Sequence, residues 1–600
     1  MDFGFKIHFA EESVYVSSGQ LTGEVNDNVT VYKTKVGHVD VVWTHTAHKG
    51  GLLIDMEVSS QKPLGITRLD SIVLDMGIPC PTDHITLMGR ETTDNEIRFP
   101  HELGIGNEYC ETAVGLYKTL DAKGTVMAGV APFQNICQAV ACKDAASRFT
   151  FCVKTEYTKG MLDCHSLTTE RAYLHLNTTL DELFTVYRDL LPQSSFPMPK
   201  LTGWNTWDYY LDKVTAGDVL ENITALKNMS FAKDLDYIVL DDGWQKGWGN
   251  WTENEKFSCG LKAVADQICA AGFLPGIWMA PVAVKPDTPI FQEHPEWFCR
   301  DTDGELLYRV RMYYLDPTHP DVRKFILDNY RYQYRAGFKL FKIDFLSPLL
   351  AAKSFYDKNA TPYGVIADLI ADVKACTGPD VVVLGCSLPP ECGADIAPSM
   401  RIGLDTHNYF PHVASISRTI AWAWMYNNKI TRIDPDFLVV RGEETSTEAP
   451  DTTIDNHYYI PPRHKQTDTD RFGVIWRNGE QFNAVEAETW ANMVAISGGN
   501  LFLSDRMSVL NERGIQILEN AFSLAGDEVR PVYLKDDHRV PSLWLGDKGL
   551  LLVNWEEIPR TITVTGIHQT LVAKKPFIQE GDKLTVTLLP HESFAACYLQ

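Results

Sequence analysis

The alternation of apolar and polar positions changes character twice along the chain. From residue 1 to about residue 190, apolar and polar residues alternate in short runs such as Val29-Thr30-Val31-Tyr32, and Gly, Asn and Pro interrupt these runs. A period of two predicts strands with one buried face and one exposed face. Residues 1–190 are therefore predicted to form a β-sandwich. Pro192, Pro197 and Pro199 follow within nine residues, which excludes a helix interior or a central strand and predicts a linker.

The next part of the chain alternates strand-like and helix-like patterns. Helical periodicity separates short apolar runs, as at 216–227, 262–271, 321–336 and 363–375. Eight βα units in succession predict a (β/α)8 TIM barrel over residues 200–522. The predicted strands are 201–204, 237–240, 274–279, 340–343, 381–384, 401–404, 437–440 and 500–503.

After residue 525 the period returns to two, as in Leu550 to Val553 and Leu584 to Leu588. This pattern predicts a small antiparallel β-domain over residues 525–600. The predicted fold class is thus multidomain α/β and all-β, with a central barrel, an N-terminal β-sandwich and a small C-terminal antiparallel β-domain.

Two aspartates stand at the ends of predicted barrel strands. Asp344 closes the apolar run that begins at Phe341, and Asp405 follows Met400-Arg401-Ile402-Gly403-Leu404. Barrel enzymes carry their chemistry at the C-terminal ends of the strands, so two acids there indicate catalysis. A helix N-cap or a solvated turn stays the alternative for either acid taken alone.

Other residues at the predicted strand ends fit a sugar pocket. Paired carboxylates bind neighbouring hydroxyls, and aromatic faces stack on the C–H patches of a pyranose. Asp241-Asp242 could also ligate a divalent cation, but histidine and cysteine spacings typical of metal sites are missing, so no metal and no cofactor are expected. A buried structural thiol is the alternative for the cysteine in this set. The candidate pocket residues are Trp204, Asp241, Asp242, Trp278, Lys342, Cys386 and Arg401.

Composition limits the classes of binding partner and the cellular compartments that fit this chain. The net charge of −23 disfavours binding to nucleic acid or to an anionic membrane. No stretch reaches the roughly 18 apolar residues that cross a bilayer, and residues 1–10 do not resemble a secretory signal. The 13 cysteines are scattered without a C-x-x-C pair, which favours reduced thiols. A cytoplasmic protein is predicted, and a homo-oligomer is left open.

Several short motifs follow one another along the barrel. They are Leu240-Asp241-Asp242-Gly243-Trp244, Pro275 to Pro281, Glu293-His294-Pro295-Glu296-Trp297, Phe341 to Leu346, Gly385-Cys386 and Met400 to Thr406. In this order they resemble the α-galactosidases of glycoside hydrolase family 36, in particular the compact bacterial type. This family also has an N-terminal β-sandwich and a C-terminal β-domain. The resemblance implies a retaining exo-glycosidase that removes terminal α-linked galactose from oligosaccharides or glycoconjugates.

The resemblance also assigns roles to the candidate residues. Asp344 is expected to be the nucleophile and Asp405 the general acid/base of a double displacement. Asp241 and Asp242 would bind the axial 4-hydroxyl and the 6-hydroxyl. Lys342 and Arg401 would orient the ring, Trp278 would form a pocket wall, and Cys386 would lie near the 2-hydroxyl.

The two roles require opposite protonation states. A basic residue beside the nucleophile is expected to favour its ionised form. The acid/base has to hold a proton, so Asp405 is expected in surroundings that disfavour its charge.

Two departures from the family pattern bear on specificity. Ser387-Leu388-Pro389 follows Cys386 where the family places glycines, so an α-N-acetylgalactosaminidase with the same mechanism is an alternative. The stretch from Gly442 to about Arg477 is long for a βα connection and is predicted to be a lid or an aglycone-binding loop. An α-galactosyl transferase and an inactive sugar-binding protein also stay open, because fold alone does not establish activity.

Overall fold

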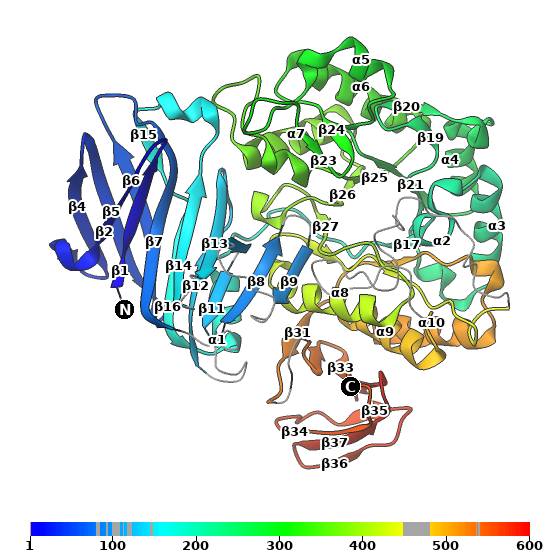
Figure 1. The fold of residues 1–600 in the computed structure, drawn as a ribbon. Helices are drawn as coiled ribbons and strands as arrows, with labels where there is room; N and C mark the ends of the chain where they lie inside the picture. Colours follow the sequence, from blue (N-terminus) through cyan, green and yellow to red (C-terminus); the bar gives the residue numbers. More distant parts are fainter. Residues whose placement is uncertain are drawn as a thin grey trace.

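A parallel sheet at the centre of the molecule forms the barrel (Figure 1). The computed structural model describes residues 2–79, 85–91, 94–98, 108–111, 113–116, 123–143, 148–447, 481–535, 537 and 540–599. The order of the strands in the sheet is β28-β27-β26-β25-β21-β18-β17-β30-β29. Their bounds are β17 Thr202–Asn205, β18 Tyr237–Leu240, β21 Leu274–Met279, β25 Leu340–Ile343, β26 Val382–Gly385, β27 Ser399–Arg401, β28 Arg432–Asp434, β29 Phe437–Leu438 and β30 Leu501–Leu503.

The barrel closes through a break in its seventh strand. The two outermost strands of the sheet, β28 and β29, are neighbours in sequence, with only Pro435 and Asp436 between them. The strand pattern predicted one strand here, at 437–440; instead β28 pairs with β27 and β29 pairs with β30. Asp436 has a φ of +73°, a conformation that an ordinary strand residue does not adopt. The strand turns at Asp436 and so contacts both neighbours.

The helices of the barrel start and stop where local chemistry dictates. Thr215 and Asp218 form a capping box at the start of α3, and prolines 320 and 362 open α6 and α7, where no N–H is needed. The bounds are α2 Trp207–Tyr210, α3 Ala216–Leu226, α4 Leu261–Ala270, α5 Pro289–Glu293, α6 Pro320–Ala336, α7 Pro362–Cys376, α8 Phe410–Ala423, α9 Ala484–Ile496 and α10 Glu512–Leu524.

One βα unit departs from the predicted eight. Between β26 and β27, all of whose connecting residues are described, the chain forms only the 3-10 turn Pro390–Cys392. The N-terminal sandwich covers this position instead. Phe133 N–H donates to the carbonyl oxygen of Glu391 at 2.8 Å, and a side chain at Gly393 would meet Pro132. The sandwich thus takes the place of a barrel helix.

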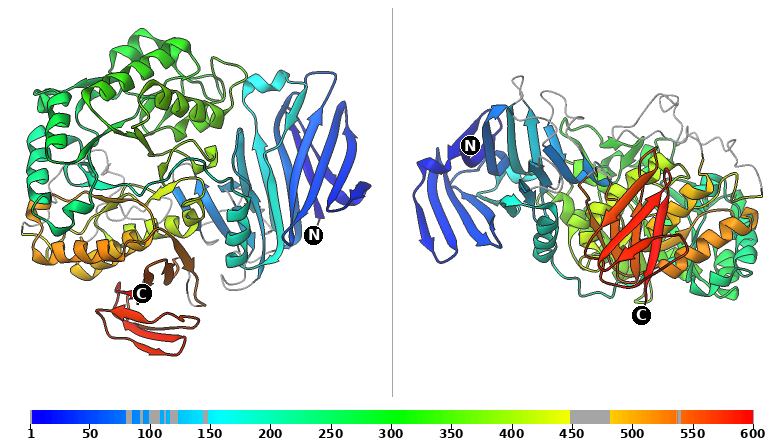
Figure 2. Two further views of the ribbon diagram at one scale, coloured as in Figure 1. Left: turned by 180° about the vertical axis from the view of Figure 1, so that it is seen from behind. Right: turned by 90° about the horizontal axis from the view of Figure 1, so that it is seen from below.

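The predicted β-sandwich is confirmed as two antiparallel sheets that stand beside the barrel (Figure 2). The interior between them holds Phe5, Trp43 and Phe151, each at most 1% exposed. One sheet contains β10 Glu108–Glu111, β13 Ile136–Lys143, β14 Arg148–Glu156, β7 Ile66–Pro79, β1 Asp2–Phe9 and β2 Ser13–Ser17. The other contains β3 Gly23–Asn26, β4 Val29–Val36, β5 Val39–His48, β6 Gly51–Ser59, β16 Ala172–Thr178, β12 Gly124–Gly129, β11 Ala113–Leu116, β8 Ile85–Glu91 and β9 Asp94–Arg98, with β15 Ser166–Thr168 beside β6.

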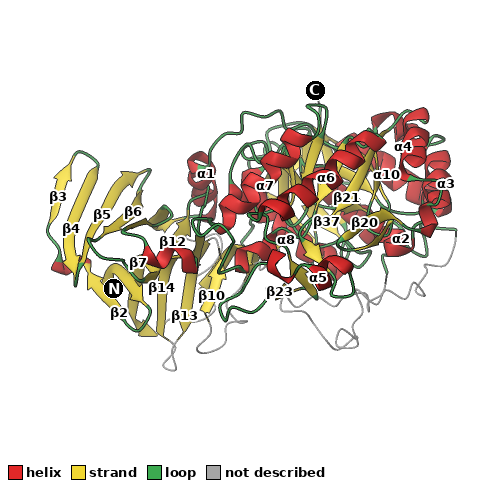
Figure 3. Cartoon of the chain, turned by 90° about the horizontal axis from the view of Figure 1, so that it is seen from above, coloured by secondary structure: helices red, strands yellow, loops and turns green. Residues whose placement is uncertain are grey.

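Helix α1, Leu180–Leu190, lies between the sandwich and the barrel (Figure 3). The Tyr187 ring packs against Trp422 of α8, and its hydroxyl donates to Gly129 of the sandwich at 2.8 Å. Arg188 donates to three carbonyl oxygens just after α8, including that of Met425 at 2.9 Å. This helix therefore joins the two parts through both apolar and polar contacts.

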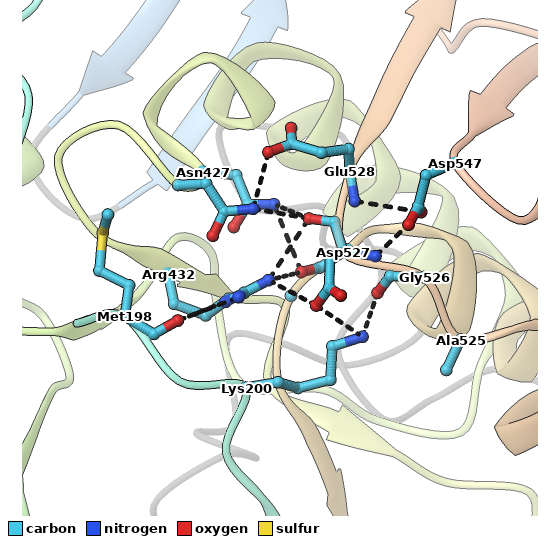
Figure 4. Close-up of polar contacts among 12 residues, drawn as sticks. Met198, Lys200, Asn427, Arg432, Ala525, Gly526, Asp527, Glu528 and Asp547 are labelled. Atoms are coloured by element: carbon cyan, nitrogen blue, oxygen red, sulfur yellow. Dashed lines mark hydrogen bonds and ion pairs between the residues drawn. The ribbon is translucent and has the colours of Figure 1, made fainter.

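Polar contacts around Arg432 join the linker, the barrel and the segment just before the C-terminal β-domain (Figure 4). Arg432, the first residue of β28, donates to the carbonyl oxygens of Met198 in the linker and of Gly498. It also pairs with Asp527 at 3.2 Å, just before the domain begins. The small antiparallel domain is confirmed; its sheets contain β31 Val529–Val532, β32 Leu543–Gly546, β33 Gly549–Val553, β38 Ser593–Tyr598 and β35 Leu571–Ala573, and β34 Arg560–Val564, β37 Lys583–Leu588 and β36 Ile578–Glu580.

Within the described ranges, every helix is too short or too polar to span a bilayer.

Candidate active site

Asp344 follows the last residue of β25 and is 7% exposed. The Trp278 indole N–H donates to its Oδ2 at 3.0 Å, and the Phe345 N–H donates to its Oδ1 at 2.7 Å. Phe345 has a φ of +57°, which is strained for an aromatic residue and is held by an edge contact with Trp248. The turn after β25 thus fixes the orientation of the Asp344 carboxylate.

Asp241 and Lys342 form a buried ion pair beside it. Their Oδ2 and Nζ atoms are 2.8 Å apart, and both side chains are 3% exposed. Asn205 Nδ2 donates to the same oxygen at 2.8 Å. The Asp241 N–H donates to the Thr206 hydroxyl oxygen at 3.0 Å. The sequence indicated that Lys342 supports the nucleophile; the structure places its ammonium on Asp241.

Asp242 is held by neutral donors. Trp248 Nε1 donates to its Oδ2 at 3.2 Å, and Gln245 Nε2 donates to its Oδ1. Burial, with a contribution from Asp241, raises the pKa of Asp242 to about 6 even though the hydrogen bonds from Gln245 and Trp248 oppose the rise. The adjacent acids therefore differ: Asp241 has a cationic partner, whereas Asp242 has neutral ones.

Arg401 holds two carboxylates at the other side of the sequence-predicted site. Its Nη1 lies 2.5 Å from Asp405 Oδ1 and 3.6 Å from Asp436 Oδ1. The second Asp405 oxygen accepts a hydrogen bond from Trp207 Nε1 at 3.1 Å, and the second Asp436 oxygen accepts one from Thr406 N–H at 2.7 Å. Asp405 is the more accessible acid, with a side chain 16% exposed against 1% for Asp436.

The electrostatics of these two acids correct the sequence-based expectation for Asp405. Burial favours its neutral form, but Arg401, Lys342 and His407 outweigh burial and lower its pKa. Burial raises the pKa of Asp436 to about 8, against the opposing effect of Arg401 and Lys342. The surroundings therefore favour the proton on Asp436 over Asp405, and the sequence did not pair Asp436 with Arg401.

A second charged cluster supports the loop that carries Asp405. His407 Nδ1 lies 2.9 Å from Asp208 Oδ1, and Arg441 pairs with both Asp208 and Asp505 at 2.5 and 2.8 Å. His412 Nε2 lies 2.5 Å from the Asp405 carbonyl oxygen. These contacts fix the loop from two sides.

Cys386 and the loop after β26 lie next to these acids. The Cys386 side chain is fully buried, and burial raises its thiol pKa despite the nearby Arg401. Ser387 turns the chain with a φ of +53°, and its hydroxyl is 2.7 Å from that of Ser347. Leu388 is fully buried, and its side chain packs directly over Gly385.

Not every predicted residue reaches the group. Trp204 is fully buried, and its indole N–H donates to the Asp505 carbonyl oxygen at 2.8 Å, which favours a packing role over sugar stacking. Trp278 is only 2% exposed, which leaves little of its ring free to line a pocket. Its indole N–H donates to Asp344. Of the predicted lid, residues 448–480 lie outside the described residues.

Sequence reasoning did not select Trp248 as a site residue. It does place Asp436 at the end of a barrel strand, but it did not pair Asp436 with Arg401. Trp248 belongs to a hairpin loop, between β19 Gln245–Gly247 and β20 Asn250–Glu253, and Asp436 sits in the strand break. The run Ile433-Asp434-Pro435-Asp436-Phe437 sets an acid between two apolar segments, but it does not show which cation that acid meets.

Comparisons with known proteins relate part of the sequence and the overall fold to α-galactosidases. The family model described as Melibiase matches residues 183–335. The crystal structure of the family 36 α-galactosidase AgaA from Geobacillus stearothermophilus has a TM-score of 0.62 and 13% sequence identity, covering 99% of this chain and 89% of that one. The family model agrees with the resemblance to α-galactosidases over part of the chain, and the structural likeness shows the same fold.

Two curated relatives match shorter segments. An α-galactosidase of Escherichia coli is 28% identical over 154 residues, which cover 24% of this chain and 20% of that protein. The "A type blood alpha-D-galactosamine galactosaminidase" of Flavonifractor plautii is 30% identical over 118 residues, 19% of this chain and 10% of that protein. The chain thus spans a fifth or less of the length of these curated relatives.

Proposed function

We propose that this protein is a retaining exo-glycosidase that hydrolyses terminal α-linked galactose from oligosaccharides by double displacement. The observation that carries the proposal is the pair of acids at one end of the barrel, Asp344 and Asp405, held in contrasting ways. Indole and amide N–H groups orient Asp344, whereas a guanidinium holds Asp405. Two acids with different partners suit a nucleophile and an acid/base.

In this mechanism Asp344 attacks the anomeric carbon and Asp405 protonates the departing oxygen. Asp405 then takes a proton from water, which releases the sugar with its configuration retained. Retention requires the two carboxyl groups to be about 5–5.5 Å apart across the scissile bond.

Asp241 and Asp242 supply the proposed selectivity for the sugar. These two aspartates are only 2% and 4% exposed. Acids buried this deeply suit contact with the terminal sugar of an oligosaccharide, which favours exo action. An α-glucoside turns its 4-hydroxyl the wrong way and leaves a buried acceptor without its partner. Losing charged hydrogen bonds of about 1.5–3 kcal/mol each should lower kcat/KM by about a hundredfold or more.

An α-N-acetylgalactosaminidase is the second candidate. The segment that departs from the family pattern, Ser387 to Pro389, follows the cysteine proposed to lie near the 2-hydroxyl. Leu388, its largest apolar residue, is buried and packs against Gly385, so the polar Ser387 is the neighbour of Cys386 that differs from a glycine without being an apolar side chain. The F. plautii relative, which is similar to this chain over 118 residues, is named as a galactosaminidase, and this supports the second candidate.

The deciding experiment compares kcat/KM for the p-nitrophenyl α-glycosides of galactose, N-acetylgalactosamine and glucose. We expect the galactoside to be the best substrate. A preference for the N-acetyl sugar would favour the second candidate, and no turnover of any of the three would favour a sugar-binding protein. Free galactose as the product, without larger oligosaccharides, would distinguish hydrolysis from galactosyl transfer. A cytoplasmic location stays a prediction.

A further inference from the structure

Asp436 is a second carboxylate on the guanidinium that holds the proposed acid/base. Both carboxylates lie against the same nitrogen, Arg401 Nη1, at 2.5 Å for Asp405 and 3.6 Å for Asp436. Asp436 also accepts the N–H of Thr406, the residue directly after Asp405, at 2.7 Å. The left-handed backbone of Asp436 breaks a barrel strand to place it there. Strained conformations of this kind concentrate at functional sites.

The charge of Arg401 poses a problem for an acid/base. A guanidinium stays charged under all relevant conditions, and the Arg401 side chain is only 11% exposed. When Asp405 carries the proton that it donates, it no longer neutralises Arg401. A buried cation without a counter-charge is strongly destabilising. A second carboxylate within reach of Arg401 removes this penalty.

We propose that Asp436 is a positioning residue that shares one proton with Asp405 and neutralises Arg401 whenever Asp405 is protonated. This inference rests on the proposed function, because an acid/base must change its charge during each turnover, whereas a residue that only binds sugar need not.

The charges balance through both steps. For cleavage the shared proton moves from Asp436 to Asp405, so that Asp344 and Asp436 are carboxylates. Asp405 gives its proton to the glycosidic oxygen as the Asp344 oxygen bonds to the anomeric carbon and the bond to the leaving group breaks. Asp344 becomes a neutral ester while Asp405 gains a charge beside Arg401. In the second step Asp405 takes a proton from the attacking water, and Asp344 is released as a carboxylate.

The groups that face Asp436 agree with this role. Arg401 on β27 and Lys342 on β25 favour its charged form. Asp434 on β28 and Asp405, in the loop after β27, disfavour it. Asp434 also accepts the Asp436 N–H at 3.2 Å. Burial is the strongest influence, and the pKa of Asp436 is raised to about 8 while that of Asp405 is lowered. One proton is thus available to the pair at neutral pH.

The variant Asp436→Asn keeps the shape and removes the charge. Protonated Asp405 would then leave Arg401 uncompensated, so the pKa of Asp405 should fall and the alkaline limb of kcat/KM should move to lower pH. At pH 7.5 we expect a loss of about tenfold to a hundredfold on an alkyl α-galactoside and a much smaller loss on a dinitrophenyl α-galactoside, which departs without protonation.

Asp505→Asn is the matched control. Asp505 is a buried carboxylate at the same end of the barrel, but it neutralises Arg441. We expect this variant to lose stability and to keep the alkaline limb in place. An unmoved limb in Asp436→Asn, or equal movement in both variants, would overturn the inference. If the unaltered protein turns over no α-galactoside, the proposed function fails instead.

Infrared spectroscopy tests the shared proton without activity. At pH 7 the unaltered protein should show a protonated carboxyl band that Asp405→Asn and Asp436→Asn each weaken, because the remaining acid then pairs with Arg401 alone. A band unchanged in Asp405→Asn would overturn the proposal, even if Asp436→Asn did not fold.

Discussion

Lys342 and Arg401, the buried cations beside the sequence-predicted acids, have different numbers of acidic partners. Lys342 pairs with one carboxylate, Asp241, which Asn205 also holds. Arg401 lies against two carboxylates, Asp405 and Asp436, at unequal distances. Both groups lie at the C-terminal ends of the barrel strands and both are shielded from water. Only the second has a carboxyl, Asp436, whose pKa is raised to about 8.

This difference separates a fixed charge from a changeable one. A pair of one cation and one carboxylate has no net charge as long as neither group changes its protonation. Such a pair suits a group that binds a hydroxyl in the same way throughout a reaction. One cation with two carboxylates leaves room for one proton, which suits a group that gives and takes a proton. Under the proposed function, the two compositions serve two tasks, sugar binding beside Lys342 and proton transfer beside Arg401.

The largest expected effect is at the acid that lies outside both ion pairs. Asp344→Ala should lower kcat on activated aryl α-galactosides by about 10⁴-fold or more, because no other group replaces the nucleophile. Azide should restore part of the activity and yield a product of inverted configuration. Steady-state kinetics and product analysis by NMR measure both. Activity within tenfold of the unaltered protein would refute the assignment of Asp344.

The next effect distinguishes the acid/base from a purely structural partner of Arg401. Asp405→Ala should slow substrates with poor leaving groups by about 10²–10⁴-fold, and should slow dinitrophenyl α-galactosides far less. Rates over a series of leaving groups measure this contrast. Equal losses across the series would show that Asp405 does not donate a proton.

A matched pair of substitutions compares the stability of the two clusters. Asp241→Asn leaves the Lys342 ammonium without a counter-charge and should lower the free energy of unfolding by about 3–5 kcal/mol. Asp405→Asn removes the same charge, but Asp436 can then neutralise Arg401, so the loss should be less than half as large. Urea denaturation at pH 7 gives both values. Equal losses would contradict the role of Asp436 as a second counter-charge.

The smallest expected effect is in the pH dependence of stability. The pKa of Asp436 is raised to about 8 and that of Asp434 to about 6, both chiefly by burial. The native state therefore holds protons that the unfolded chain releases near pH 4, and this stability is lost as the pH rises through about 4–8.

Between pH 6 and pH 9 the Tm of Asp436→Asn should consequently fall less than that of the unaltered protein. The difference should correspond to about 1–3 kcal/mol in the free energy of unfolding. Thermal unfolding at constant ionic strength provides the measurement, and Asp241→Asn serves as the comparison because it leaves Asp436 in place. A slope that persists in Asp436→Asn would assign the pH dependence to other groups.

Most barrel strands could be read from the sequence because a strand buried on both faces is a short apolar run. β18, β21 and β25 have the bounds that the sequence pattern predicted. The prediction was wrong at the seventh strand and at the unit after β26. A strand split by Pro435-Asp436 has no apolar run of ordinary length, and a missing helix is tolerated only because the sandwich covers its place.

The sequence by itself determined which acids reach the C-terminal end of the barrel, because the position of a residue after a buried strand fixes that end. Asp241, Asp344 and Asp405 were found in this way. The partner of each acid was decided only by the tertiary structure. Lys342 is two residues from Asp344 in sequence yet pairs with Asp241, and Asp436 reaches Arg401 from another strand. Charges act through space and burial, so proton affinities depend on neighbours that only folding brings together.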